Sequence, residues 1–179
     1  MEANGLNEGS GRNYEGYSAG DNMVSERYIK LSSGQYTVVD ADDYADLSKS
    51  KWHVFTSPER NTSYAQSRRN SKTVRMHRLV TNAGRGQHVD HINRDGLDNR
   101  KSNLRLATRS QNQANSTKQK NNKSGYKGVH ADGKKWRARL RHNGVNYYLG
   151  LFKNPVDAAK AYDAKAFELS GAFALLNAD

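Results

Sequence analysis

The sequence predicts an α+β protein, because its 179 residues carry signals for short strands joined by tight turns and, separately, for a few helices. Short runs rich in β-branched and aromatic residues, bounded by Asn, Asp, Gly and Ser, are typical of strands joined by tight turns. Between them stand residues that favour helix starts, with glutamine or an acid three positions later. Hydrophobic residues make up only 35% of the chain, so any core is small.

The first half of the chain carries the weaker signals. Residues 1–26 are rich in Gly, Asn, Ser and Glu without apolar periodicity, and we expect a disordered tail there. Beyond it we expect four short strands, a short helix from Asp40, and a second helix with Met76, Leu79, Val80 and Ala83 on one face. The four strands are expected at Tyr28–Leu31, Gln35–Asp40, Lys51–Phe55 and Ser63–Ser67.

Composition excludes several classes of protein. The chain has no cysteine, so disulfide scaffolds and thiolate metal sites are excluded. No apolar run approaches the roughly 18 residues of a membrane span, and the N-terminus has no apolar segment typical of a secretion signal. We therefore expect a soluble, cytoplasmic protein without a membrane partner. No heptad or long apolar patch indicates a dimer, and a monomer is the simpler expectation.

Positive charge is concentrated in the middle of the chain. The net charge is +11, and residues 101–150 contain twelve Lys or Arg against a single acid. A polyanion such as DNA is the natural partner of such a stretch. The alternative is a solvated basic surface with no ligand.

Residues 88–116 combine the groups needed for metal-assisted hydrolysis. Val89–Ile92 is expected to form a strand, followed by a polar loop over 93–102 and a returning strand, Asn103–Ala107. A helix is expected to follow, because Thr108 and Gln111 have the spacing of a capping box. Adjacent Asp and His at 90 and 91 share one site only if their strand ends, twists or bulges there. Together with an amide from the helix they offer hard oxygen ligands for Mg²⁺ and an imidazole base.

This segment resembles the ββα-metal motif of HNH endonucleases of phage and mobile-element homing type. The resemblance rests on Asp90-His91, Asn103-Leu104-Arg105, Thr108 and Asn112, with His77-Arg78-Leu79 upstream. It implies a nuclease domain over 27–116, with its metal-binding core at about 88–116. Asp90 and Asn112 would be metal ligands for Mg²⁺ or Mn²⁺, and His91 the general base. Asn103 would orient the imidazole and steady the hairpin. The His88-x-x-His91 pair is a spacing that can suggest zinc, but on a strand it places the two histidines on opposite faces, which disfavours that alternative.

Beyond a basic linker over 117–123, the chain predicts a three-stranded antiparallel sheet packed on one helix. The strands are expected at Gly125–Ala131, Lys134–His142 and Val145–Phe152, joined by Asp-Gly and Asn-Gly turns that favour hairpins. Asn154 and Pro155 indicate a helix start, and Gly171 its end. Arginines alternate along the middle strand and would line its outer face.

Residues 124–179 resemble the APETALA/ethylene-response-factor type of DNA-binding domain. The resemblance rests on Tyr126-Lys-Gly-Val-His130, Lys135-Trp-Arg-Ala-Arg-Leu-Arg141, Tyr148-Leu-Gly-Leu-Phe152 and Ala158-Ala-Lys-Ala-Tyr-Asp163. It implies that a set of basic and polar residues faces DNA: Lys127, Gly128, His130, Arg137, Arg139, Arg141, Asn146 and Tyr148.

The sequence thus leads to the hypothesis of a site-selective, divalent-metal-dependent endonuclease of homing type acting on double-stranded DNA. The main alternative is a regulatory or architectural DNA-binding protein with a decayed nuclease site. An RNA-binding module is less favoured, because no aromatic stacking platform is evident.

Overall fold

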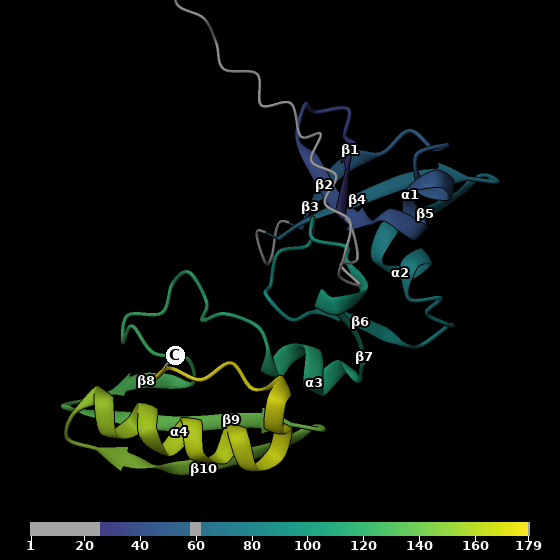
Figure 1. The fold of residues 1–179 in the computed structure, drawn as a ribbon. Coiled ribbons are helices and arrows are strands. Elements are labelled where there is room, and N and C mark those ends of the chain that lie inside the picture. The colour runs from purple at the N-terminus through teal and green to yellow at the C-terminus, as the bar shows by residue number, and fades with distance from the viewer. Residues whose placement is uncertain (1–25, 58–61, 179) are drawn as a thin grey trace, which may run out of the picture.

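The computed structural model describes residues 26–57 and 62–178, which form three successive parts (Figure 1). The predicted disordered tail lies outside the described residues, except that Glu26 already begins the first strand. Small antiparallel sheets and short helices alternate through all three parts, as expected of an α+β chain. Among the described residues, no helix is long and apolar enough to cross a membrane.

The N-terminal part contains a two-stranded sheet, a three-stranded sheet and two short helices. A small core around Trp52, Val39, Leu31 and Met76 holds it together. The strand Lys72–Arg75 of the larger sheet was not predicted. The second helix ends at Val80, three residues earlier than expected. The elements are β1 (Glu26–Lys30), β2 (Tyr36–Asp40), α1 (Ala41–Leu47), β3 (His53–Thr56), β4 (Ser63–Arg69), β5 (Lys72–Arg75) and α2 (Met76–Val80).

The middle part is the predicted strand–loop–strand–helix unit. Strands β6 (His88–His91) and β7 (Leu104–Ala107) pair antiparallel, and the helix α3 (Arg109–Ala114) follows. A single 3-10 turn, Lys101–Asn103, precedes β7. The predicted capping box is present, because the Thr108 hydroxyl accepts the Gln111 N–H while the Gln111 side chain accepts the Thr108 N–H. These reciprocal bonds fix where α3 begins.

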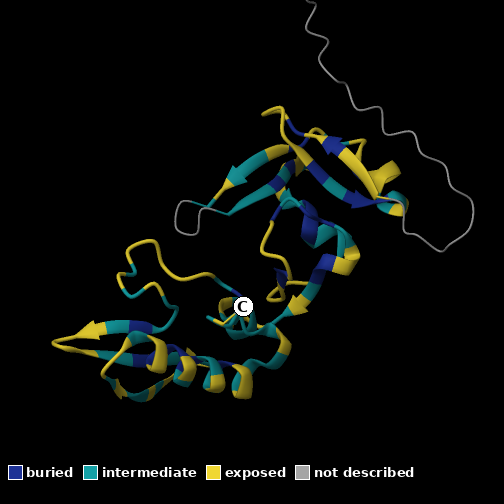
Figure 2. Cartoon of the chain, turned by 60° about the vertical axis from the view of Figure 1, so that its left-hand side comes forward, coloured by how far each residue is buried: buried dark blue, intermediate teal, exposed yellow. Residues whose placement is uncertain are grey.

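The C-terminal part is a three-stranded antiparallel sheet covered by one helix (Figure 2). The strands are β8 (Val129–Asp132), β9 (Lys135–His142) and β10 (Val145–Phe152), and the helix is α4 (Pro155–Ser170). The first strand begins four residues later than expected. Alanines at 138, 158 and 159 are buried between sheet and helix, so the two layers approach closely.

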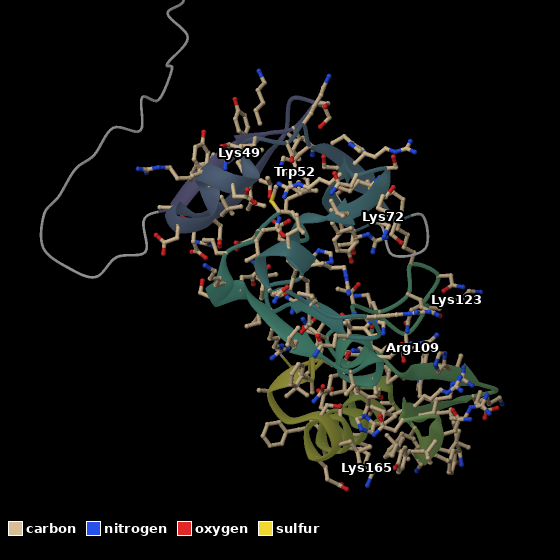
Figure 3. The ribbon with its side chains drawn as sticks, turned by 90° about the vertical axis from the view of Figure 1, so that its right-hand side faces the viewer. Lys49, Trp52, Lys72, Arg109, Lys123 and Lys165 are labelled. Carbon is tan, nitrogen blue, oxygen red and sulfur yellow. The ribbon has the colours of Figure 1, made fainter. Side chains whose placement is uncertain are left out.

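The C-terminal part contacts the middle part through α3. The Leu175 N–H donates to the Ala114 carbonyl at 3.0 Å, and Ser110 contacts the His142 ring at 3.3 Å. The 3-10 turn Gly171–Phe173 that follows α4 lies against α3 as well. In Figure 3, Arg109 at the start of α3 lies between Trp52 of the N-terminal part and Lys165 of α4.

Candidate active site

The end of β6 brings Asp90 and His91 into one cavity. The cavity has a volume of about 690 Å³ and is also lined by Asn112 of α3. Both Asp90 and His91 are buried, with 3% and 6% of their surface exposed. His91 is the last residue of the strand, so the alternation of side chains ends there. The condition under which adjacent residues can share a site is therefore met.

The carboxylate of Asp90 is held by two side chains to which the sequence analysis assigned no role, Arg105 of the Asn103-Leu104-Arg105 motif and Asn115. Arg105, its partner in the β6–β7 register, donates from Nε and Nη2 to Oδ2, both at 2.8 Å. The Nδ2 group of Asn115 lies 3.0 Å from Oδ1 and 3.1 Å from Oδ2. The same Nδ2 group lies 2.8 Å from the His91 carbonyl. Asn115 therefore fixes the backbone and the side chain at the end of β6 together.

The imidazole of His91 is enclosed by aromatic rings. Its centroid lies 5.1 Å from that of His77 and 5.9 Å from that of Tyr64. Burial lowers the pKa of His91, although Asn99 and nearby acidic residues favour the protonated form. His91 Nε2 and Asn99 Oδ1 are buried and make no direct hydrogen bond to any described residue. The ring is therefore neutral near pH 7 and has a nitrogen available to accept a proton.

Acid is expected to destabilise the fold through His77. Burial, aided by His91, Arg75 and Arg78, lowers the pKa of His77 to about 3. The unfolded chain binds this proton below about pH 6.5, whereas the folded chain stays unprotonated until about pH 3, so stability falls with pH between these values. The loss reaches about 1.4 kcal/mol per pH unit.

This pH dependence can be measured by urea unfolding between pH 7 and pH 4. His77→Gln should show a flatter dependence of the unfolding free energy on pH than the wild type. His53→Gln, a change at an exposed histidine of β3, is the control and should keep the wild-type slope. Equal slopes in His77→Gln and the wild type would contradict the prediction.

Asn103 supports the loop between β6 and β7. Its Oδ1 accepts the N–H of Asn93 at 2.9 Å, and its Nδ2 donates to the Asp98 carbonyl at 2.8 Å. Its own carbonyl accepts the Ile92 N–H at 2.9 Å. These contacts support the predicted steadying of the hairpin. The side chain that lies beside the imidazole is that of Asn99, a residue of the predicted polar loop over 93–102 to which the sequence assigned no role.

Asn99 also connects the site to the N-terminal part. It is fully buried, its Nδ2 donates to Thr37 Oγ1 at 2.8 Å, and its N–H donates to the Val38 carbonyl at 2.8 Å. Thr37 in turn donates to the Leu97 carbonyl at 2.6 Å. Strand β2 thus braces the loop that carries Asn99. No local signal in the sequence predicts this contact across some 60 residues.

The donor set of the cavity fits a divalent cation with hard-ligand preference. Asp90 and Asn112 offer a carboxylate and an amide oxygen to the same cavity. No cluster of three His, Cys, Asp or Glu side chains able to hold a metal occurs in the described ranges. Mg²⁺ accepts such a sparse protein set, because it keeps waters and binds substrate phosphate. His88, the second residue of the zinc alternative, is exposed and borders a smaller cavity that His91 does not line.

Six of the eight residues expected to face DNA lie on one face of the C-terminal sheet. The register pairs His130 with Arg137, Tyr148 with Arg139, and Asn146 with Arg141. The opposite face carries the core residues that pack on α4. Tyr148 is 67% exposed, and Arg139, Arg141 and Asn146 are exposed as well. This face is therefore basic, open and continuous across three strands.

Lys127 and Gly128 are placed differently, away from that face. The Lys127 ammonium donates to the Ala114 carbonyl at the end of α3, where a positive charge is favourable. Burial, together with Arg94, lowers the pKa of Lys127 to about 8. Gly128 has a φ of +74°, and a Cβ built on it would lie 2.0 Å from the Tyr162 ring. Both residues therefore serve contacts within the chain.

Two comparisons with known proteins identify the family. The HNH endonuclease family matches residues 74–114, which span α2 and the whole strand–loop–strand–helix unit. An uncharacterized HNH endonuclease of Acanthamoeba polyphaga mimivirus is 30% identical over 163 residues, covering 88% of this chain and 82% of that protein. No solved structure matches the chain. The chain belongs to the HNH endonuclease family.

Proposed function

We propose that the protein is a site-selective endonuclease of homing type that hydrolyses phosphodiester bonds of double-stranded DNA with one divalent cation, Mg²⁺ or Mn²⁺. The observation that carries the proposal is the cavity shared by Asp90, His91 and Asn112, in which Nε2 of the imidazole has no hydrogen-bond partner among the described residues. Family membership supports nuclease chemistry, since the matched region contains all three residues.

In the proposed reaction, Nε2 of His91 takes a proton from water. The resulting hydroxide attacks phosphorus, the bond between phosphorus and the 3′-oxygen breaks, and that oxygen leaves with a proton from solvent. The products carry a 5′-phosphate and a 3′-hydroxyl. Burial that keeps His91 unprotonated near neutral pH supports its role as the base. Asp90 and Asn112 would hold the cation, which would supply positive charge to the phosphoryl oxygens and the leaving oxygen.

Basic residues around the cavity support a nucleic-acid substrate. Arg94 of the β6–β7 loop and Lys118 and Lys120 of the linker line the same cavity as His91. Their charges can hold phosphates on either side of the reacting bond. The open basic face of the C-terminal sheet offers a second DNA contact, with same-face residues along β9 about 6.8 Å apart.

Incubation of the purified chain with supercoiled plasmid DNA tests the proposal. Mg²⁺ or Mn²⁺ should produce nicked or linear DNA with 5′-phosphate ends, and excess EDTA should stop the reaction. Asp90→Asn, which removes the ligand charge at nearly constant shape, should lose cleavage while retaining DNA binding. Tight, salt-sensitive binding without strand scission under all metal conditions would favour the alternative of a decayed nuclease site. Preference for RNA in a competition assay would contradict the assigned substrate.

Neutralising the exposed arginines of the C-terminal sheet should weaken DNA binding and its salt dependence. Each phosphate contact contributes about 0.9 to the slope of log K against log salt concentration. The double variant Arg139→Ala/Arg141→Ala should therefore lower this slope by up to about 2. Fluorescence anisotropy with a labelled duplex measures both quantities. Lys160→Ala, on the outer side of α4, is the matched control, and an equal effect there would contradict this DNA-binding face.

A further inference from the structure

Arg105 connects the Asp90 carboxylate to the segment that follows α4. Its Nε and Nη2 donate to Asp90 Oδ2, and its Nη1 donates to the Ala172 carbonyl at 2.9 Å. Its guanidinium carbon lies 3.8 Å from the centre of the Phe173 ring. The guanidinium group thus contacts Asp90 on the neighbouring strand β6. It also contacts Ala172 and Phe173, which lie 67 residues or more further along the chain.

The contact with Asp90 distinguishes the two carboxylate oxygens. Both donors of Arg105 that reach Asp90 bind Oδ2, whereas the one hydrogen bond to Oδ1 from the described residues comes from the Asn115 amide. A carboxylate oxygen has two lone pairs, so Oδ1 keeps one for a further ligand. The side chain of Asp90 is 4% exposed and that of Arg105 is 19% exposed, so the pair is shielded from solvent. A shielded pair of this kind holds its orientation firmly.

The turn Gly171–Phe173 keeps Arg105 in this orientation. The Phe173 ring lies against the guanidinium group. The Ala172 carbonyl accepts from Nη1, the nitrogen that does not bind Asp90. A cation above an aromatic face is attracted by the ring, and the planar guanidinium stacks where an ammonium cannot. The C-terminal part therefore reaches the nuclease site through one side chain.

We propose that Arg105 is a positioning residue for the metal ligand: clamped by Phe173 and Ala172, it engages Oδ2 of Asp90 and leaves Oδ1 directed to the cation. This rests on the proposed function, in which Asp90 binds the cation. It follows that the segment after α4 sets the metal affinity of the nuclease site although it contributes no ligand. Residues that orient metal ligands typically change affinity 10- to 100-fold when replaced.

Mn²⁺ titration of the full chain without DNA tests the inference. Paramagnetic broadening of the His91 backbone amide signal in NMR spectra gives the affinity. Arg105→Lys keeps the positive charge and loses the planar fork, and it should weaken Mn²⁺ binding about tenfold. Phe173→Leu keeps an apolar side chain and loses the aromatic face, and it should give a smaller loss. Phe167→Leu, at a 62% exposed aromatic residue of α4, is the matched control and should bind as the wild type.

The outcomes separate the inference from the proposed function. Asp90→Asn should abolish the broadening whether or not Arg105 positions the carboxylate. If it does so while Arg105→Lys and Phe173→Leu bind Mn²⁺ as tightly as the wild type, or more tightly, the inference is overturned and the proposed function stands. If Asp90→Asn binds Mn²⁺ like the wild type, the metal site itself is wrongly assigned and both fail. Should Arg105→Lys not fold, Phe173→Leu alone decides the point.

Discussion

Replacing His91 with alanine is expected to slow plasmid cleavage by about a thousandfold while DNA affinity stays close to that of the wild type. The expectation follows from the position of the ring. His91 is buried at the end of β6, its Nε2 has no partner among the described residues, and its pKa is lowered by burial. Loss of the imidazole removes the acceptor of the water proton and leaves the proposed cation ligands in place.

A purely structural role of His91 can be separated from a catalytic one by chemical rescue. Truncation to alanine leaves a space in the cavity, and imidazole added to the buffer can occupy it. Partial recovery of cleavage with added imidazole is expected if His91 is the base. His53→Ala, at an exposed histidine of β3, controls for general effects of removing an imidazole. Unimpaired cleavage by His91→Ala would remove the proposed base altogether.

Activity should also fall in acid for the same reason. Since burial lowers the pKa of His91, the base form persists below the usual pKa of about 6.5 for histidine and is lost only as pH falls further. Cleavage by the wild type should therefore decline on the acidic side at a pH below 6.5.

The elements that the sequence predicted correctly are those with local signals. The capping box at Thr108 and Gln111 needs only four consecutive positions, and it fixes the start of α3 as expected. The Asn143-Gly144 turn has positive φ at both residues, the geometry that this pair of residues favours. Arginines alternate along β9 because side chains of a strand alternate, and the register confirms one basic face. Signals of this kind predict local structure correctly without knowledge of tertiary contacts.

The side chains that support the candidate site were not predicted from the sequence, because they act through tertiary contacts. Asn99 appears in the sequence as one more polar loop residue, yet it contacts Thr37 across 62 positions. Asn115 lies near the end of the predicted metal-binding core at about 88–116, where no motif marks it, yet its side chain is buried against Asp90. Each polar residue was a plausible turn or surface residue by its local pattern alone. Only the contacts of β2 with the β6–β7 loop and the packing of α3 on β6 select them.

Lys127 shows the limit of carrying a role over from a family resemblance. The resemblance of residues 124–179 implies that Lys127 faces DNA, whereas its ammonium group donates to the last carbonyl of α3. The choice between the two depends on where α3 ends relative to the C-terminal sheet. That placement arises from contacts such as the bond between Leu175 and Ala114, which no periodicity reveals.

Gly128→Ala is expected to unfold or strongly loosen the C-terminal part, with a loss of about 3 kcal/mol or more. A Cβ at this position would lie 2.0 Å from Cδ2 of Tyr162 and 2.8 Å from the Arg139 carbonyl. The carbonyl belongs to backbone of β9, whose Arg139 N–H donates to Gly128 at 2.9 Å, so it cannot withdraw without loss of that bond. The positive φ of +74° adds strain for any residue with a side chain.

Gly133→Ala separates backbone strain from steric conflict. Gly133 also has a positive φ, of +58°, but a Cβ there would meet no atom of the described residues within 4 Å. It should therefore cost only the strain, about 1 kcal/mol. Hydrogen exchange of the β8–β10 amides compares the two variants with the wild type, and the N-terminal part should keep its protection in both. If Gly128→Ala kept wild-type protection and lost only DNA affinity, the glycine would be a DNA contact, as the resemblance of residues 124–179 to APETALA-type domains implies. Its close packing on Tyr162 would then not govern the stability of the C-terminal sheet.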